Sequence, residues 1–251
     1  MLKWIIGGFV ILIVSIAGLV IALQAPTNWT TAETIRTPED RFANLADYPF
    51  SPNYVDVEGY RIHYVDAGPR DGELILLMHG QPSWSYLYRH MIPLLTEAGY
   101  RVIAPDLVGF GKSDKPLKQS DHSYQMHVDV MTAFAGQLDV QNVTLFAQDW
   151  GGLIGLRMVA EDPDRYDRIM ISNTGLPAAG GLRGWIGYPV IRWQVWREGK
   201  PDTIGDGGEF RFTRWIAWAM HSDNFDLPTL FQGATTRTLS DDELAGYAAP
   251  F

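Results

Sequence analysis

The stretch Val143–Gly152, VTLFAQDWGG, decides the fold. Its first four residues form a β-branched and apolar run typical of a strand, and from Gly152 the apolar residues follow a helical spacing. Small residues, Ala147 and Gly151, lie two positions on either side of Asp149, which allows the backbone to turn sharply. The stretch therefore predicts a strand, a tight turn and a helix, with Asp149 at the apex of the turn.

A strand-to-helix turn of this kind is the shape of a nucleophile elbow, in which the apex side chain is held up for reaction. A carboxylate is ordinarily ionised at neutral pH and can attack carbon without first losing a proton. It is a poor nucleophile for acyl transfer but can displace a leaving group from saturated carbon, and the positive end of the following helix favours its charge. The alternative is that Asp149 is only the N-cap of an ordinary helix.

Composition limits the class of protein. The 251 residues are 46% hydrophobic and 20% charged, which is typical of a globular chain that buries one core and carries an insertion. The net charge of -9 argues against nucleic acid as a partner. Cysteine is absent, so disulfides, thiolate metal sites and a cysteine nucleophile are excluded. The histidines do not have metal-ligand spacing with carboxylates, and we expect no metal or other cofactor.

The amino terminus carries a long apolar run. Trp4–Leu23 contains no charge, and as a helix it would be about 30 Å long, which matches a bilayer core. We predict a transmembrane signal anchor over residues 1–24 and a polar linker over 25–34; the alternatives are a cleaved signal peptide, whose apolar region is usually shorter, and a buried core helix. Lys3 is the only basic residue before the run, which favours a single-pass membrane protein with its bulk outside.

Downstream, strand and helix patterns alternate. Such a rhythm predicts βαβ units, a mainly parallel sheet and a ligand site at the carboxyl ends of its strands. The predicted core covers residues 35–177, and the predicted incomplete helical cap covers 178–251. We expect strands at 54–57, 61–65, 74–78, 101–104, 143–146 and 169–172, core helices at 86–98, 124–138 (capped by Asp121) and 153–160, and cap helices at 184–197 and 210–220.

Several segments together resemble one family, the haloalkane dehalogenases. These are α/β-hydrolases, and the similar subfamily uses an Asp nucleophile, an Asp acid, a His base and two halide-binding Trp. The resemblance runs from about Glu33 to Phe251. The segments that carry it, beside the elbow, are RTPEDRFANLADYPFSPNY (Arg36–Tyr54), HGQPSW (His79–Trp84), SYLYRHMIP (Ser85–Pro93) and RVIAPDLVGFGKSDKP (Arg101–Pro116).

The resemblance assigns roles to individual positions. Asp149 matches the family nucleophile, and Trp150 matches a halide-binding Trp whose backbone N–H also serves the oxyanion hole. Gln81 matches the position that supplies the second oxyanion N–H. Trp215 matches the second halide-binding Trp, with Trp218 as the fallback. These two Trp are three residues apart and share a helix face, so either could instead pack the cap.

The chemistry of these side chains fits that reading. Indole N–H groups donate hydrogen bonds without carrying charge, so two of them can hold a departing halide without neutralising a nearby carboxylate. Asp149 would attack the halogen-bearing carbon, and water would then attack the resulting ester, whose oxyanion the N–H groups of Gln81 and Trp150 would stabilise. The expected partners are a small haloalkane, water and a halide ion.

In an α/β-hydrolase the catalytic acid and the His base follow the nucleophile along the chain. Neither is found at its expected position in this sequence. His221 is the only histidine after Asp149 and lies in the predicted cap, and Asn173 occupies an alternative acid position. In relatives the acid and the His come later than Phe251. We therefore expect a truncated chain that lacks the end of its cap and the last strands of its sheet, exposes a sheet edge and does not turn over, although Asp149 could still be alkylated once.

Two other functions remain open. An epoxide hydrolase uses the same Asp elbow but needs cap tyrosines to polarise the epoxide oxygen, and Tyr188 and Tyr247 are candidates. The second alternative is a membrane-tethered module that keeps the α/β-hydrolase fold but does not catalyse a reaction. Halide release compared with diol formation would separate the two enzymes.

Overall fold

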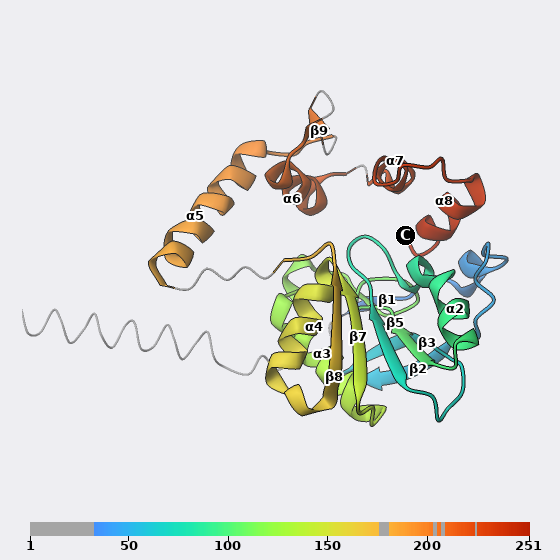
Figure 1. The fold of residues 1–251 in the computed structure, drawn as a ribbon. Coiled ribbons are helices and arrows are strands. Elements are labelled where there is room, and N and C mark those ends of the chain that lie inside the picture. Colours follow the sequence, from blue (N-terminus) through green and yellow to red (C-terminus); the bar gives the residue numbers. More distant parts are fainter. Residues whose placement is uncertain (1–32, 176–180, 203–204, 207–208, 224) are drawn as a thin grey trace, which may run out of the picture.

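A computed structural model describes residues 33–175, 181–202, 205–206, 209–223 and 225–251. Strands and helices alternate over residues 34–172, and helices dominate the described residues after them (Figure 1). The strands are β1 (Thr34–Ile35), β2 (Asn53–Val57), β3 (Tyr60–Ala67), β4 (Leu74–Met78), β5 (Arg101–Pro105), β6 (Lys115–Pro116), β7 (Val143–Gln148), β8 (Tyr166–Ser172), β9 (Gly205–Asp206) and β10 (Glu209–Phe210). The α-helices are α2 (Met91–Glu97), α3 (Tyr124–Gln137), α4 (Trp150–Glu161), α5 (Gly181–Glu198), α6 (Phe212–His221), α7 (Leu227–Gly233) and α8 (Asp241–Ala248), and the short 3₁₀ turns are η1 (Glu39–Phe42), η2 (Ser85–Tyr88), η3 (Gln119–Asp121) and η4 (Pro163–Arg165).

The main sheet has six strands in the order β2-β3-β5-β4-β7-β8. Strands β5, β4, β7 and β8 run parallel, while β2 and β3 form an antiparallel hairpin at one edge. This confirms the predicted α/β fold with a mainly parallel sheet. The carboxyl ends of the neighbouring strands β4 and β7 lie side by side because Met78 pairs with Ala147.

Both faces of β4 are buried, which explains why this strand is apolar throughout. Its alternate residues Leu74, Leu76 and Met78 join the core under α3 and α4, whereas Ile75 and Leu77 join the core on the side of α2. Figure 1 shows α3 and α4 on one face of the sheet and α2 on the other. A continuous apolar run is the pattern expected of a strand covered on two sides.

Two predicted helix starts need correction. The segment predicted as one helix over 86–98 is a 3₁₀ turn, η2, followed by α2. Pro93 has no N–H to donate to the carbonyl of Arg89, so a continuous helix would leave that carbonyl without its partner. The cap of α3 is Ser123 rather than Asp121, since the Ser123 hydroxyl accepts a hydrogen bond of 3.1 Å from the Met126 N–H.

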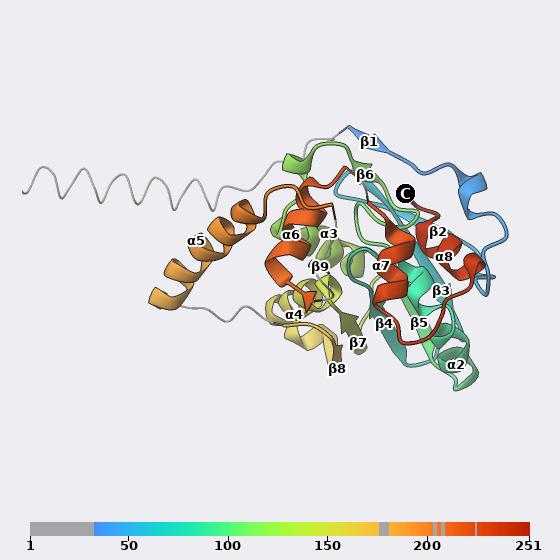
Figure 2. The same cartoon turned by 90° about the horizontal axis from the view of Figure 1, so that it is seen from above.

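Helices α5 to α8 follow the sheet. Helix α5 projects to one side in both views (Figure 2), and the side chains of Tyr188, Trp193 and Trp196 on it are exposed. Helices α7 and α8 pack on the core through an apolar cluster that contains Leu230, Phe231 and residues of β4 and α2. The boundary between core and cap at residue 177 stays a prediction.

The predicted anchor and most of the linker, residues 1–32, lie outside the described residues. Among the helices that the structure does describe, none combines the length and apolar character needed to cross a bilayer. At the other edge of the sheet, β8 has its flank uncovered in the described part of the chain, and Ile169, Met170 and Ile171 are exposed.

Candidate active site

The elbow has the predicted form. Strand β7 ends at Gln148, α4 begins at Trp150, and Asp149 between them has φ 53° and ψ -124°. Positive φ is costly for a residue with a Cβ, and such strain concentrates at functional sites. Asp149 occupies the N-cap position of α4, but its carboxylate makes no capping hydrogen bond to the helix, so capping does not account for this side chain.

Glycines let the elbow come close to the end of β4. A Cβ on Gly151 would collide with the carbonyl oxygens of Met78 and His79, and a Cβ on Gly80 would collide with the side chain of Asp149. Neither the β4 carbonyls nor the strained Asp149 can move far. The small residues therefore place the loop after β4 directly against the nucleophile candidate.

The backbone N–H of Gln81 donates a hydrogen bond of 2.8 Å to Oδ1 of Asp149. A donor that holds one carboxylate oxygen leaves the other oxygen available for attack. The held oxygen would become the carbonyl oxygen of an ester at Asp149, so the same N–H would face the negative charge that forms when water adds. The structure thus brings together Asp149 and Gln81, which lie 68 positions apart in the sequence.

His79 fixes the orientation of the peptide that carries this donor. Its ring is fully buried; Nδ1 donates to the Gly80 carbonyl at 3.0 Å, and Nε2 accepts from the Leu107 N–H at 2.9 Å. An Nε2 that accepts a hydrogen bond carries no proton, and burial lowers the pKa of His79 below its usual value. His79 is therefore a neutral positioning residue.

A second buried carboxylate, Asp106, organises the loop beside the site. It contacts Nδ1 of His63 at 2.7 Å and accepts hydrogen bonds of 2.8 Å from the backbone N–H groups of Ser85 and Lys112. Burial alone would raise the pKa of Asp106, but His63 and the other donors outweigh it and lower the pKa to about 2. Sequence reasoning did not assign Asp106 a role, because its partners lie up to 43 positions away.

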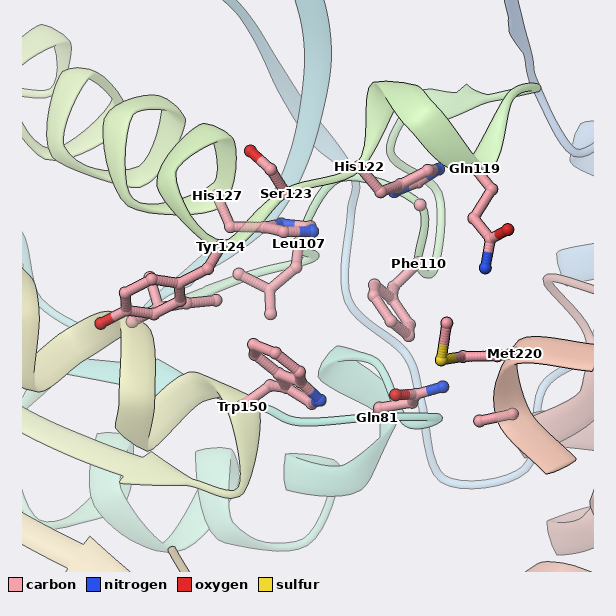
Figure 3. A pocket seen from close by; sticks show the side chains of 13 residues that line it. Gln81, Leu107, Phe110, Gln119, His122, Ser123, Tyr124, His127, Trp150 and Met220 are labelled. Carbon is pink, nitrogen blue, oxygen red and sulfur yellow. The ribbon is translucent and has the colours of Figure 1, made fainter. Parts of the chain in front are cut away.

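A cavity of about 560 Å³ lies beside the elbow, between the core and α6 (Figure 3). No charged Lys, Arg, Asp or Glu lines it among the described residues. Asp149 is half-buried, and its neighbours Gln81 and Trp150 are both in the wall. The apolar residues of the wall are Leu107, Phe110, Trp150, Ile154, Ala219 and Met220, and the others are Gln81, Gly109, Gln119, His122, Ser123, Tyr124 and His127.

The two predicted halide-binding tryptophans differ in position. Trp150 lines the cavity and is 38% exposed, which leaves its ring open to a ligand. Trp215 is absent from the wall; its ring stacks on Trp218 at 5.7 Å between centroids, and Trp218 stacks on Phe225 at 4.4 Å. The structure therefore groups Asp149, Gln81 and Trp150, and leaves Trp215 in an aromatic stack on α6.

Comparisons with known proteins agree with this geometry. A family model described as alpha/beta hydrolase fold matches residues 73–201. A haloalkane dehalogenase of Psychrobacter cryohalolentis is 46% identical over 222 residues, which cover 86% of this chain and 65% of the relative. A haloalkane dehalogenase of Mycobacterium marinum is 42% identical over 224 residues, covering 87% of this chain and 67% of the relative. The chain belongs to the haloalkane dehalogenase family.

Solved structures with a similar fold include a dehalogenase and an epoxide hydrolase. A tetrameric haloalkane dehalogenase from Paraglaciecola agarilytica matches with a TM-score of 0.69 and 32% identity, over 87% of this chain and 66% of that one. An epoxide hydrolase from Vigna radiata matches with a TM-score of 0.62 over 80% of this chain and 67% of that one, but at 23% identity it supports the α/β-hydrolase fold alone. The chain spans about 65% of the length of the first curated dehalogenases it matches.

Proposed function

We propose that the protein hydrolyses haloalkanes to an alcohol and a halide ion through an alkyl ester on Asp149. The observation that carries the proposal is the hydrogen bond of 2.8 Å from the Gln81 N–H to a carboxylate on a strained elbow beside an uncharged cavity. A haloalkane has no charge and little capacity for hydrogen bonds, so an uncharged and partly apolar cavity suits it.

In the first step, the free oxygen of Asp149 attacks the carbon that bears the halogen. The new bond joins that oxygen to carbon while the carbon–halogen bond breaks and the halide leaves with its electron pair. In the second step, water adds to the ester carbonyl carbon and loses a proton, and the N–H groups of Gln81 and Trp150 stabilise the oxyanion. The oxyanion then collapses, the bond from the carbonyl carbon to the alkyl-bearing oxygen breaks, and the alkoxide takes up a proton and leaves as the alcohol, which restores the Asp149 carboxylate. The added water needs a general base, and we assign no described residue of this chain to that role.

The halide requires donors at the point where it departs. We propose Trp150, whose indole lies in the cavity wall, and Trp215 for this task. Trp150 has the stronger support because it already faces the cavity. For Trp215 the support is its match to the family position and its place on α6, the helix that contributes Ala219 and Met220 to the wall.

The rival epoxide hydrolase has weaker support. Its cap tyrosines would have to reach the cavity, but Tyr188 is 67% exposed on α5, and Tyr247 is buried against Phe231 with ring centroids 4.1 Å apart. Neither tyrosine is in the cavity wall. The two functions are separated with a bromoalkane and an epoxide of matched size. Release of bromide from the bromoalkane, without formation of a diol from the epoxide, would support the dehalogenase.

Intact-protein mass after incubation with 1-bromobutane tests the first step directly. We expect one butyl adduct, located at Asp149 by peptide mapping, and no adduct on Asp149→Asn, which keeps the size of the side chain but removes the charge. A wild-type sample that is folded by circular dichroism and stays unmodified would overturn the proposal. An adduct on some other carboxylate would do the same.

We also propose that residues 1–24 anchor the protein in a membrane as a single span, on the basis of the uncharged run Trp4–Leu23. Fractionation of cells that express the whole chain should find it in the membrane pellet after an alkaline wash. A version that lacks residues 1–24 should move to the supernatant. Recovery of the whole chain in the supernatant would refute the anchor.

A further inference from the structure

Helix α5 carries exposed aromatic side chains along one side. Trp193 and Trp196 are 52% and 74% exposed, and Figures 1 and 2 show that α5 projects from the rest of the molecule. Elsewhere on the same helix, Val195 is buried, and Glu198 accepts a hydrogen bond of 3.1 Å from the hydroxyl of Thr213 on α6. At about 3.6 residues per turn, the two tryptophans lie on the side of α5 that is opposite to the side facing α6.

Two exposed arginines flank these tryptophans. The guanidinium of Arg192 lies 5.8 Å from the centre of the Tyr188 ring, and that of Arg197 lies 4.9 Å from the centre of the Trp193 ring. Within the described residues the ion pairs of α5 are those of Glu198, so neither arginine has a carboxylate partner. We call the set Tyr188, Arg192, Trp193, Trp196 and Arg197 the α5 face. It is both aromatic and positively charged.

This combination of side chains suits the boundary between lipid and water. An indole ring has an apolar body and a single N–H donor, so it is favoured where acyl chains meet headgroups. An arginine guanidinium forms paired hydrogen bonds with phosphate oxygens. Exposed tryptophan with arginine beside it on a projecting helix is the pattern of helices that lie on a membrane surface.

Charge favours a lipid surface over two other partners. A second copy of the chain would present the same two arginines, so two α5 faces would repel each other. A nucleic acid would have to approach a chain whose net charge is -9, which repels a polyanion. A bilayer that meets only the projecting helix, as Figure 2 shows it, stays clear of most of that negative charge.

We propose that the α5 face lies on the surface of a membrane that contains anionic phospholipids, with its tryptophans among the headgroups and its arginines at the phosphates. The contact is separate from the reaction at Asp149. It is also distinct from the anchor proposed for residues 1–24, although that anchor would favour it. The nine residues 25–33 would reach roughly 30 Å at full extension, which keeps the described part of the chain close to the bilayer.

The test uses the absence of cysteine, because a single introduced cysteine can carry a fluorescent label at one defined position. An environment-sensitive nitrobenzoxadiazole label is placed on Trp196→Cys, which leaves Trp193 and both arginines in place. Leu94→Cys in α2 is the matched control, since Leu94 is 67% exposed on another element. The full chain is incorporated into vesicles of phosphatidylcholine alone or mixed equally with phosphatidylglycerol. We expect blue-shifted emission at position 196 in the mixed vesicles, and unchanged emission at position 94.

Charge reversal shows whether the arginines hold the contact. Arg192→Glu and Arg197→Glu, each in the Trp196→Cys background, should lower the labelled population in contact with lipid at least about fivefold, since one basic residue near an anionic surface contributes about 1 kcal/mol. Arg157→Glu on α4 changes the net charge by the same amount at another exposed site, and it should leave the emission unchanged. Equal emission in all three variants would overturn the proposal.

Three further outcomes would also overturn it. One is aqueous emission at position 196 in both kinds of vesicle, from a protein that is folded by circular dichroism. Another is a blue shift without lipid that grows with protein concentration, which would assign the face to a second copy. The third is equal emission in the two kinds of vesicle. Should fractionation show that residues 1–24 do not anchor the chain, the same label is read after mixing with preformed vesicles, so failure of the anchor and failure of the α5 contact are told apart.

Discussion

The elbow and the cap attach to the rest of the molecule in different ways. The elbow is built from backbone: two glycines without room for a Cβ, and an N–H of Gln81 that meets Asp149. Helix α8, in the predicted cap, is held by side chains, among them Arg89, which bonds Glu243 at 2.7 Å and lies over the Tyr86 ring at 4.3 Å. Backbone geometry tolerates almost no change, whereas a side-chain contact can be weakened in steps, so the two regions should respond to mutation with different severity.

The largest effect is expected from Gly151→Ala. The new methyl group would meet the carbonyls of Met78 and His79, and neither carbonyl can withdraw without distorting β4. We expect a loss of about 3 kcal/mol in the free energy of unfolding and no detectable adduct at Asp149. Gly136→Ala in α3 is the matched control, because a Cβ there meets nothing within 4 Å, and it should be neutral or stabilise the protein by up to about 1 kcal/mol. Equal denaturation midpoints for the two variants would contradict a backbone-built elbow.

Acid should weaken the elbow side through Asp106. Its pKa is about 2 in the folded protein, against about 3.9 in an unfolded chain. A lowered pKa contributes stability at pH values above the unfolded value, and that contribution is lost as the pH falls from about 4 through about 2. The expected size is on the order of 2 kcal/mol.

Other carboxylates also titrate in this range, so the measurement is a difference. Urea unfolding of the wild type and of Asp106→Asn is compared at pH 6 and at pH 2.5. The gap in unfolding free energy between the two proteins should narrow at pH 2.5. If the difference in unfolding free energy is the same at pH 6 and at pH 2.5, the contact with His63 does not stabilise the charged form of Asp106.

Sequence patterns predicted the elbow side well, for a physical reason. The run Leu74–Met78 and the small residues around Asp149 are local signals, and they fix a strand and a turn whatever the rest of the chain does. The same patterns singled out Asp149, and the family resemblance singled out Gln81; the structure joins the two by a hydrogen bond of 2.8 Å. They could not find the role of Asp106, because it depends on which distant residues pack nearby.

The cap side was predicted less completely. Helix α8 went unpredicted although its signal is present: Ser240 and Glu243 form a capping box in which each side chain accepts a hydrogen bond from the other's backbone N–H. The helix break between η2 and α2 could have been read from Pro93. Contacts of Arg89 with α8, 154 positions later, have no local signal at all.

Arg89→Met should therefore loosen α8 with a smaller cost than Gly151→Ala. The variant removes the bond to Glu243, but Glu243 keeps a second partner in Arg237 at 2.9 Å, so its charge is not left alone. We expect a loss of about 1 to 2 kcal/mol and faster hydrogen exchange of the α8 amides, with exchange in β7 unchanged. Faster exchange throughout β7 would mean that the cap contact also holds the elbow.

The smallest expected change separates the two tryptophans of α6. Trp215 is only partly buried, and if it holds the departing halide, Trp215→Phe should slow adduct formation at Asp149 about tenfold, or roughly 1.4 kcal/mol, with little effect on unfolding. Trp218 is 3% exposed between Trp215 and Phe225, so Trp218→Phe should instead lower stability by about 1 kcal/mol and leave the rate nearly unchanged. The reverse pattern would transfer the halide role to Trp218. Equal rates in both variants and the wild type would leave Trp150 as the sole indole at the leaving group. The whole reaction would then take place at the elbow, which backbone contacts hold in position.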